Sequence, residues 1–329
     1  MTISVIIPAY NASRWLPSAV ASVCAQTRPA DEIVIVDDGS TDGTRDLCRT
    51  FPKGIRYVAR ENGGLAAARN TGVAATSGEW ILFLDADDVL LPDALASLSA
   101  TADPSPSGVV YGFILQRRAL ATEARLHGLP YAVGVPPAPA KAHFWWTPIP
   151  TAGAALVRRS LNDEVGGFDE NFRQVEDAEY WLRCGVTAPF AHCDRVVLDK
   201  SYTPASLGQQ EAGSIWFRLQ LQRKFLLWCE HKGIDAGFLG TNSREIADHA
   251  FLRIHRQKAW GLLDQVLAQA DEMGVKSPWY WRSRITARGM KLAGMLSANP
   301  PVYPVVYSRW MESRTSSLER PPHFDGSDS

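Results

Sequence analysis

Short apolar runs alternate with helical stretches over the first two hundred residues of this 329-residue chain. Between the first two runs, apolar residues recur every three or four positions from Trp15 to Val23, which predicts a helix with one buried face. Helices are also expected from Thr41 or Asp42 to about Phe51 and over residues 65–76. The β-branched composition of the apolar runs predicts strands at 3–8, 32–37, 55–59, 79–85 and 108–115. The order β-α-β-α-β-α-β is typical of an α/β protein, with a parallel sheet covered by helices.

The pattern changes twice farther along the chain. Residues 128–150 are dense in Pro and Gly and predict a loop or an excursion at the edge of the sheet. Beyond about residue 206 the strand pattern stops, and amphipathic helices are predicted at 213–231, 243–273 and 279–297. The polar tail is expected to be disordered. We therefore expect an α/β domain over 1–205, a helical region over 206–312 and a disordered tail over 313–329.

Charge and cysteine content narrow the class of function. The chain has 34 Lys and Arg against 35 Asp and Glu, so a nucleic-acid binder held by bulk positive charge is not expected. Five scattered cysteines without CxxC spacing indicate buried thiols in a reducing compartment, with no disulfides and no zinc site. No apolar run approaches the ~18 residues that cross a bilayer, and the first residues do not form a secretory signal. These features predict a cytoplasmic protein.

The second predicted strand ends in two carboxylates, Asp37 and Asp38, followed by Gly39. Open α/β sheets bind ligands at the carboxyl ends of their strands, so a nucleotide could bind there. A carboxylate can accept a hydrogen bond from a base N–H or a ribose hydroxyl, and the glycine permits a tight turn against a ligand. The alternative is a purely structural Asx turn with helix capping.

The fourth predicted strand runs apolar from Trp80 to Leu84 and then presents Asp85, Asp87 and Asp88. These carboxylates repel one another, and a hard divalent cation with oxygen ligands would neutralise them. The pattern predicts a Mg²⁺ or Mn²⁺ site that also holds a diphosphate. The alternative is a solvated acidic turn before a helix that starts near Pro92.

A glycine pair, Gly63 and Gly64, opens an alanine-rich helix that carries Arg69. The loop can approach a ligand closely, and the guanidinium can offer several donors to a phosphate or a base carbonyl. The alternative is a surface arginine that pairs with Glu61. The GxxxxGK[ST] pattern of a Walker loop is absent.

Four motifs in order resemble the catalytic domain of the family 2 glycosyltransferases: SVIIPAYN, VDDGSTDGT, ENGGLAAARNTG and LFLDADD. The later segment GGFDENF, followed by VEDAEYWLR, is similar to the family's GGFDE and ED motifs. Read without the family, Glu176 and Asp177 of that segment are acids in the first turn of a helix, with Tyr180, Trp181 and Cys184 facing inward. The resemblance implies the GT-A fold, which is a nucleotide-binding mixed sheet flanked by helices.

The resemblance also implies a reaction and a set of residues. It implies inverting, non-processive transfer of a sugar from a nucleotide donor, expected to be UDP-linked, with Asp177 as the general base beside Glu176 and a Mn²⁺ or Mg²⁺ cofactor. The resemblance assigns Asp88 to the metal and Asp87 either to the metal or to the ribose of the nucleotide. Glycines 64, 166 and 167 and Asp169 are assigned to the donor sugar or the acceptor. The nucleotide is assigned to Pro8, Ala9, Tyr10, Asn11, Asp37, Asp38, Arg69, Asp85 and Asp87.

Two departures from the family pattern leave alternatives open. The run QLQRK at 220–224 lacks the tryptophan of the QxxRW motif of processive members. Thr203 stands where many non-processive members place a histidine that reaches the metal or the diphosphate. The first departure makes QLQRK an accidental partial match, and Thr203 keeps a catalytically silent nucleotide-sugar binder or scaffold as the alternative function. A sugar-nucleotide pyrophosphorylase is disfavoured, because no glycine-rich basic loop follows the first strand.

The C-terminal region is basic and aromatic over residues 275–314, with seven Lys and Arg against one acid, Glu312. Such a mixture is typical of a surface that contacts an anionic bilayer, which would suit a lipid-linked or membrane-proximal glycan acceptor. The alternative is helix packing against the catalytic domain with solvated basic faces. Polysaccharide, lipid-linked and protein acceptors all remain open, because loops and the C-terminal surface determine them.

Overall fold

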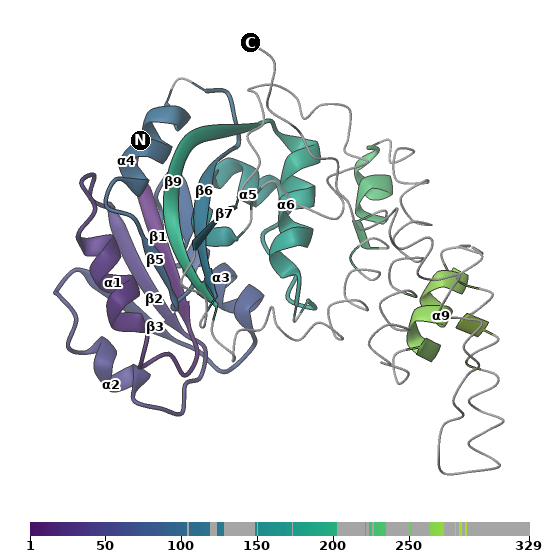
Figure 1. Cartoon of the computed structure of the whole chain (residues 1–329), viewed down its shortest axis with the longest axis horizontal. Helices are drawn as coiled ribbons and strands as arrows, with labels where there is room; N and C mark the ends of the chain where they lie inside the picture. Colours follow the sequence, from purple (N-terminus) through teal and green to yellow (C-terminus); the bar gives the residue numbers. More distant parts are fainter. Residues whose placement is uncertain are drawn as a thin grey trace.

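The computed structural model describes most of the α/β part of the chain and scattered residues of the C-terminal third (Figure 1). The described residues are 1–103, 105–118, 124–127, 149, 151–172, 174–202, 221, 224, 225, 227–234, 251, 263–272, 280, 283, 284 and 287.

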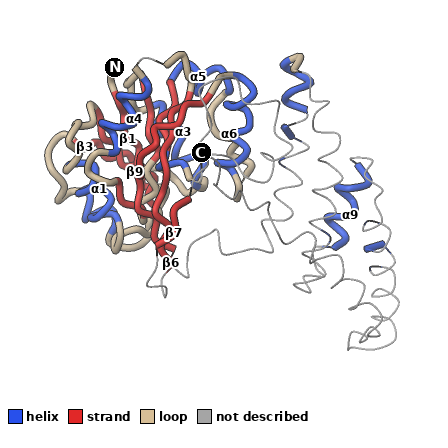
Figure 2. Tube along the Cα trace, turned by 45° about the horizontal axis from the view of Figure 1, so that its top comes forward, coloured by secondary structure: helices blue, strands red, loops and turns tan. Residues whose placement is uncertain are grey.

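One mixed sheet forms the centre of the described part, and Figure 2 shows its strands side by side between helices. The strand order is β3-β2-β1-β4-β8-β6-β9-β5, with β7 paired to β6. The first four strands are parallel, β8 is antiparallel to both β4 and β6, β9 is parallel to β6, and β5 is antiparallel to β9. The strands are β1 Ile3–Ala9, β2 Glu32–Asp37, β3 Ile55–Ala59, β4 Trp80–Phe83, β5 Asp88–Leu90, β6 Val109–Arg118, β7 Ala124–His127, β8 Ala155–Arg158 and β9 Phe190–Tyr202.

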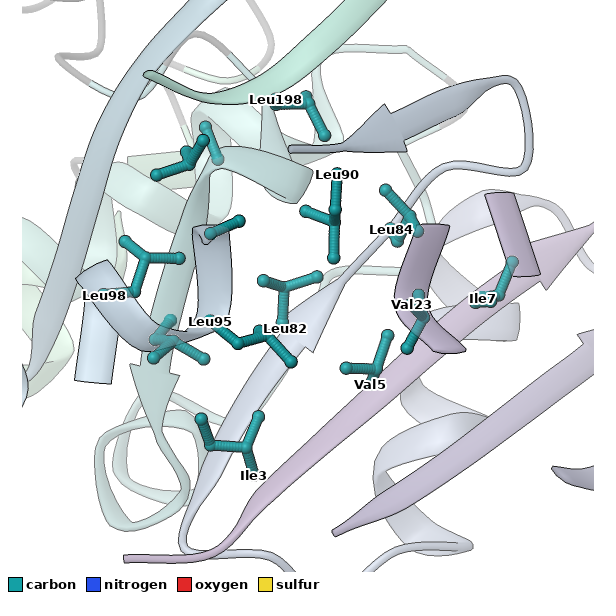
Figure 3. Packing of buried hydrophobic residues seen from close by; sticks show 14 of the residues in the cluster. Ile3, Val5, Ile7, Val23, Leu82, Leu84, Leu90, Leu95, Leu98 and Leu198 are labelled. Atoms are coloured by element: carbon teal, nitrogen blue, oxygen red, sulfur yellow. The ribbon is translucent and has the colours of Figure 1, made fainter. Parts of the chain in front are cut away.

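Helices cover both faces of the sheet, and the alternation of side chains along each strand explains why both faces are apolar. In β4, Leu82 belongs to the core on one face and Phe83 to the core on the other. The first core packs between the sheet and the helices α1 (Leu16–Cys24) and α4 (Ala94–Ala102), and Figure 3 shows aliphatic side chains of this core, among them Val5, Val23 and Leu95. The second core packs under α3, α5 and α6. The helices are α1 Leu16–Cys24, α2 Thr44–Cys48, α3 Leu65–Ala74, α4 Ala94–Ala102, α5 Arg159–Val165, α6 Glu176–Thr187 and α9 Leu263–Glu272.

The strands and helices predicted for the first hundred residues are confirmed in kind and order. The predicted strand 79–85 is shorter in the structure, where it ends at Phe83, and the chain then turns through the acidic residues into the separate strand β5. The sheet is mixed rather than parallel, as the family resemblance implied. Strands β5, β7, β8 and β9 were not predicted as separate elements, because their burial depends on pairing with distant segments.

The described residues of the C-terminal third that fall in the predicted helices 213–231, 243–273 and 279–297 are helical. The predicted loop at 128–150 and the predicted disordered tail lie outside the described residues, apart from Ile149. All five cysteines are free thiols, but the expected burial holds only for Cys184, Cys193 and Cys229, whereas Cys24 is exposed. Among the described residues, no helix combines the length and the apolar character needed to cross a membrane.

Candidate functional site

The carboxyl end of β2 is held by protein hydrogen bonds. Asp37 Oδ1 accepts from the Ser40 backbone N–H at 2.9 Å, and Asp37 Oδ2 accepts from the Tyr57 hydroxyl at 2.6 Å. Burial of Asp37 works against its charge, but the donors of Ser40 and Tyr57 outweigh it and lower the pKa of the carboxyl. This is the Asx turn that the sequence offered as the structural alternative, so a nucleotide contact by Asp37 stays a prediction.

Asp38 holds the glycine loop that precedes α3. Its Oδ1 accepts from Gly63 N at 3.0 Å, its Oδ2 accepts from Gly64 N at 2.7 Å, and Arg60 adds a salt bridge. Gly64 adopts φ 91°, which favours glycine, and α3 starts at the next residue. Asp38 is 3% exposed, so its carboxylate is buried and saturated by the protein.

The end of β1 lies between these loops. The Asn11 side-chain oxygen accepts from Thr41 N at 2.8 Å, and the Ala9 carbonyl accepts from Asp38 N at 2.8 Å. Pro8 is paired in register with Val36 of β2. Tyr10 is 55% exposed, so its ring is accessible at this strand end. The assignment of these four positions, 8–11, to a nucleotide stays a prediction.

The acidic cluster, defined as Asp85, Asp87 and Asp88, follows β4. Its three carboxylates have two described cationic partners, Arg69 and Lys200. Asp85 Oδ1 accepts from Arg69 Nη2 at 2.8 Å. Asp88 Oδ2 accepts from Lys200 Nζ at 3.0 Å, whereas Asp88 Oδ1 is buried and has no hydrogen-bond partner among the described residues. Asp88 is 1% exposed, so the alternative of a solvated acidic turn is wrong for this residue.

The pKa values of the three carboxyls in the acidic cluster shift in different directions. Burial opposes ionisation of Asp85, but Arg69 and Lys200 outweigh it and hold the pKa of the carboxyl below its usual range. Burial and the charge of Asp85 raise the pKa of Asp87. Burial raises the pKa of Asp88 to about 7, although Lys200 opposes the shift. Asp87 and Asp88 therefore ionise less readily than Asp85.

Arg69 links the acidic cluster to the second acidic motif. One of its terminal nitrogens donates to Asp85, and the other, Nη1, donates to Glu176 Oε1 at 2.9 Å. The side chain is 1% exposed and lies over the Phe168 ring, 5.0 Å from its centroid. The alternative of a surface arginine paired with Glu61 is therefore wrong. Arg69 brings together Asp85 and Glu176, which are far apart in the sequence.

The amino end of α6 presents the predicted general base. Glu176 and Asp177 lie in the first helical turn, and Tyr180, Trp181 and Cys184 are buried in the second core, as predicted. Val175, which immediately precedes them, adopts φ 57°, a strained conformation for a β-branched residue. Asp177 Oδ1 accepts from the Ala178 backbone N–H at 2.7 Å, and Asp177 is more exposed than Glu176.

Asn70 and Arg183 fix the glycine segment that precedes α6. The Asn70 side chain donates to the Phe168 carbonyl and accepts from the Phe168 N–H, both at 2.9 Å. Arg183 donates to the Gly167 carbonyl at 2.8 Å and pairs with Glu179 at 2.6 Å. Gly167 adopts φ 69°, and a Cβ there would lie 2.8 Å from Asn70 Oδ1. Neither Asn70 nor Arg183 was predicted, although the i,i+4 spacing of Glu179 and Arg183 was a usable signal.

The glycine segment also contains Gly166 and Asp169, which were assigned to the donor sugar or the acceptor. Gly166 ends α5 in the left-handed conformation with φ 85°. Asp169 Oδ2 accepts from Lys224 Nζ at 2.7 Å. Burial opposes ionisation of Asp169, but this contact and those of Asn171 lower the pKa of the carboxyl. No described feature tests the sugar or acceptor assignment.

The residues assigned to a divalent metal fit that assignment in part. Asp88 Oδ1 is a buried carboxylate oxygen without a hydrogen-bond partner among the described residues, which is the donor type that Mg²⁺ and Mn²⁺ prefer. The described residues contain no group of three His, Cys, Asp or Glu side chains placed to hold a metal by themselves. A metal here would therefore rely on Asp88, with Asp87 beside it, and on oxygens supplied by ligand and water.

Lys200 is the residue that the sequence analysis missed at the acidic cluster. It lies in β9, three residues before Thr203, in the segment that was compared with the family's histidine pattern. No local signal distinguishes it, because β9 also contains Asp194, Arg195 and Asp199, and its partner Asp88 lies 112 positions away in the sequence. Thr203 lies outside the described residues.

Comparison with known sequences identifies relatives for the same part of the chain. The family described as Glycosyl transferase family 2 matches residues 4–166. GlyA of Streptococcus pneumoniae is 41% identical over 99 residues, which cover 29% of this chain and 14% of GlyA. An uncharacterised glycosyltransferase of Nostoc sp. is 50% identical over 99 residues, which cover 29% of this chain and 31% of that protein. The chain thus matches less than a third of the length of either relative.

A longer match and a solved structure complete the comparison. The PGL/p-HBAD biosynthesis glycosyltransferase of Mycobacterium bovis is 33% identical over 187 residues, which cover 55% of this chain and 68% of that protein. TarS 1–349 of S. aureus has a TM-score of 0.61 and 18% identity, with 82% of this chain and 81% of that chain covered. TarS shares the fold, which confirms the expected GT-A architecture. The chain therefore belongs to glycosyl transferase family 2.

Proposed function

We propose that this protein is an inverting glycosyltransferase that moves a sugar from a nucleotide donor to an acceptor hydroxyl. The supporting observation is the position of Arg69, which pairs with Asp85 at the end of β4 and with Glu176 at the start of α6. Because one buried guanidinium joins both motifs, the residue next to Glu176, Asp177, is held near the acidic cluster. An inverting transfer requires this juxtaposition of a leaving-group site and a base.

Asp177 is the general base of the proposed reaction. Its carboxylate would take the proton of the acceptor hydroxyl as the new glycosidic bond forms, while the bond to the nucleotide diphosphate breaks. Glu176, paired with Arg69, orients the helix turn that carries Asp177. A single displacement of this kind inverts the anomeric centre, and its transition state resembles an oxocarbenium ion.

Asp88 and Asp87 would hold the divalent cation, with Asp85 as support through Arg69. When bound, Mn²⁺ or Mg²⁺ would neutralise the negative charge that builds up on the departing diphosphate. The buried position of Asp88 excludes water from the carboxylate, which strengthens its interaction with a cation. Asp38 and the glycine loop at Gly63 and Gly64 would form the wall of the nucleotide site, with Tyr10 exposed beside it.

The donor is proposed to be a UDP-sugar. TarS, which shares the fold, has been solved in complex with UDP-GlcNAc and with UDP. The acceptor class stays open among glycans, lipid-linked glycans and proteins. The M. bovis relative is named for PGL/p-HBAD biosynthesis, which keeps lipid-linked acceptors among the substrates to test.

Contact with an anionic membrane is a separate proposal for the basic and aromatic stretch 275–314, most of which lies outside the described residues. Co-sedimentation of the protein with anionic liposomes, weakened by salt, is the expected result. No binding at low salt would remove the proposal.

A donor screen tests the proposed function. The protein is incubated with Mn²⁺, a panel of nucleotide sugars and acceptor mixtures, and release of the nucleotide diphosphate and glycosylated product are measured. The proposal predicts release with at least one donor and loss of transfer, but not of donor binding, in Asp177→Asn. Donor binding without transfer under every acceptor tried would instead favour the silent nucleotide-sugar binder. Absence of any nucleotide binding would contradict both.

A further inference from the structure

Lys200 occupies the space between the first and last members of the acidic cluster. In the antiparallel pairing of β5 and β9, Lys200 lies directly opposite Asp88. Its Nζ is 3.0 Å from Asp88 Oδ2, 3.7 Å from Asp85 Oδ2 and 3.2 Å from Thr151 Oγ1. Oxygens of Asp88 in β5, of Asp85 in the turn before it and of Thr151 thus lie around one ammonium group.

The burial of this group makes its charge important to the cluster. The side chain of Lys200 is 17% exposed, and that of Asp88 is fully buried. Lys200 Nζ is the described donor to Asp88 Oδ2, and Asp88 Oδ1 has no hydrogen-bond partner among the described residues. Without Lys200, neither oxygen of the buried Asp88 carboxylate would keep a described donor, whereas Asp85 would keep Arg69.

We propose that Lys200 is a built-in counter-ion that weakens binding of a divalent cation to the acidic cluster until a diphosphate is present. This inference rests on the proposed function, because it concerns the cation and diphosphate of that same site. It goes beyond that function because it makes Lys200 responsible for the difference between the cation affinity without the diphosphate and the cation affinity with it. The cation and the nucleotide are then bound as a pair rather than independently.

Electrostatic repulsion is the physical basis of the proposal. In the protein without ligand, the cation must approach Asp88 Oδ1 while an ammonium contacts Oδ2 of the same carboxylate. Like charges a few ångströms apart at a buried site repel strongly. A diphosphate supplies further oxygen ligands and negative charge, so it offsets the repulsion and completes the coordination.

A titration of Mn²⁺ followed by electron paramagnetic resonance, with and without UDP, tests the inference without measuring catalysis. Wild-type protein should bind Mn²⁺ weakly alone and more tightly with UDP. In Lys200→Gln, which keeps a donor for Asp88 and Thr151 but lacks the charge, Mn²⁺ alone should bind ~10-fold or more tightly than to wild type. The tightening caused by UDP should shrink by a similar factor.

Three variants control the experiment. Lys200→Arg keeps the charge and should resemble wild type, and Lys200→Met provides a second neutral side chain should Lys200→Gln not fold. Lys224→Met removes a lysine that pairs at 2.7 Å with Asp169, outside the acidic cluster, and should leave Mn²⁺ affinity unchanged. Melting curves establish that each variant is folded.

The outcomes separate this inference from the proposed function. Unchanged or weaker Mn²⁺ affinity in a folded neutral variant would overturn the role of Lys200, even if UDP binds normally. Failure of wild-type protein to bind UDP with Mn²⁺ would contradict the proposed function, while tighter Mn²⁺ binding by the neutral variant would still support the counter-ion. No Mn²⁺ binding in wild type or in either neutral variant would overturn the inference.

Discussion

Aspartates lie at the end of β2 and in the turn after β4, the two strands that flank β1, but their carboxylates differ in how many protein donors they contact. At the end of β2, both oxygens of Asp37 and both oxygens of Asp38 accept from described protein donors. In the acidic cluster that follows β4, Asp88, the first residue of β5, has a buried oxygen with no hydrogen-bond partner among the described residues, and burial raises its pKa. Saturated carboxylates fix loops, whereas unsaturated ones retain capacity for a ligand. We therefore expect the end of β2 to form the wall of the site and the acidic cluster to contact the ligand.

The largest expected effect is on catalysis. Asp177→Asn removes the proton acceptor while nearly preserving the shape of the side chain, so transfer should fall by on the order of 10²–10⁴-fold. Binding of a donor nucleotide should change little, because the carboxylate faces the acceptor in the proposed reaction. Product formation and nucleotide binding are measured separately. Undiminished transfer would show that the base lies elsewhere.

Arg69→Met should be the most destabilising substitution, because it leaves Asp85 and Glu176 buried without their shared cation. Breaking a buried ion pair in this way is expected to cost about 3 kcal/mol in the free energy of unfolding. Chemical denaturation measures the loss. Arg60→Met is the matched control, since Arg60 pairs with Asp38 but is partly exposed, and it should cost about 1 kcal/mol. Equal losses in the two variants would argue against Arg69 as the central link.

A pair of substitutions tests the contrast between the strand ends directly. Asp38→Asn should cost about 2 kcal/mol in stability, because an amide cannot accept from Gly63 and Gly64 and also pair with Arg60. Asp88→Asn should stay within about 1 kcal/mol of wild type, since its amide oxygen can still accept from Lys200.

We then measure the melting temperature of both variants and their Mn²⁺ affinity in the presence of UDP. The variant that loses more stability should be the one that loses less Mn²⁺ affinity. Asp88→Asn is expected to lose Mn²⁺ affinity, and Asp38→Asn to keep it while its melting temperature falls. A common loss of Mn²⁺ affinity in both would break the distinction between saturated and unsaturated carboxylates.

The smallest effect is expected at the opposite end of the sheet, where Glu32 has only a structural role. Burial opposes its charge, but donors from Ser4, Ser77 and Gly78 lower its pKa to about 2. Because the pKa is lower in the folded state, the stabilisation is fully present above the unfolded value and is lost as the pH falls through about 2. Glu32→Gln should cost about 1 kcal/mol at neutral pH and leave nucleotide binding intact.

Melting temperatures measured as a function of pH check this assignment. The difference between wild type and Glu32→Gln should be constant above about pH 4.5, the unfolded value, and should shrink on acidification. A difference that grows toward low pH would have the wrong sign for a lowered pKa.

Local sequence patterns predicted the first half of the fold because its burial is local in origin. The apolar run of β4 predicts a buried strand. The spacing of Leu16, Ala19, Val20 and Val23 predicts a helix with one buried face, which is α1. By contrast, β9 contains Asp194, Arg195 and Lys200, and only its pairing with β6 and β5 identifies it as a strand of the sheet. Its contribution to the site was therefore not predictable from local pattern.

For the candidate site, the sequence likewise predicted individual residues but not their long-range partners. The acidic residues and Arg69 were identified from the sequence because each follows a strand or a glycine loop at a position where ligands bind. The partners of these residues were not, because the contacts of Arg69 with Glu176 and of Lys200 with Asp88 each span more than 100 positions. Such pairs are created by the topology of the sheet rather than by neighbouring residues.

We propose that the acidic cluster holds a divalent cation together with the diphosphate of a nucleotide. A crystal structure with UDP and Mn²⁺, in which anomalous diffraction locates manganese, is the decisive measurement. We expect an anomalous peak within ligand distance of Asp88 and close to the diphosphate of UDP. Bound UDP with manganese absent or elsewhere, and with the cluster contacted only by Arg69 and Lys200, would contradict it.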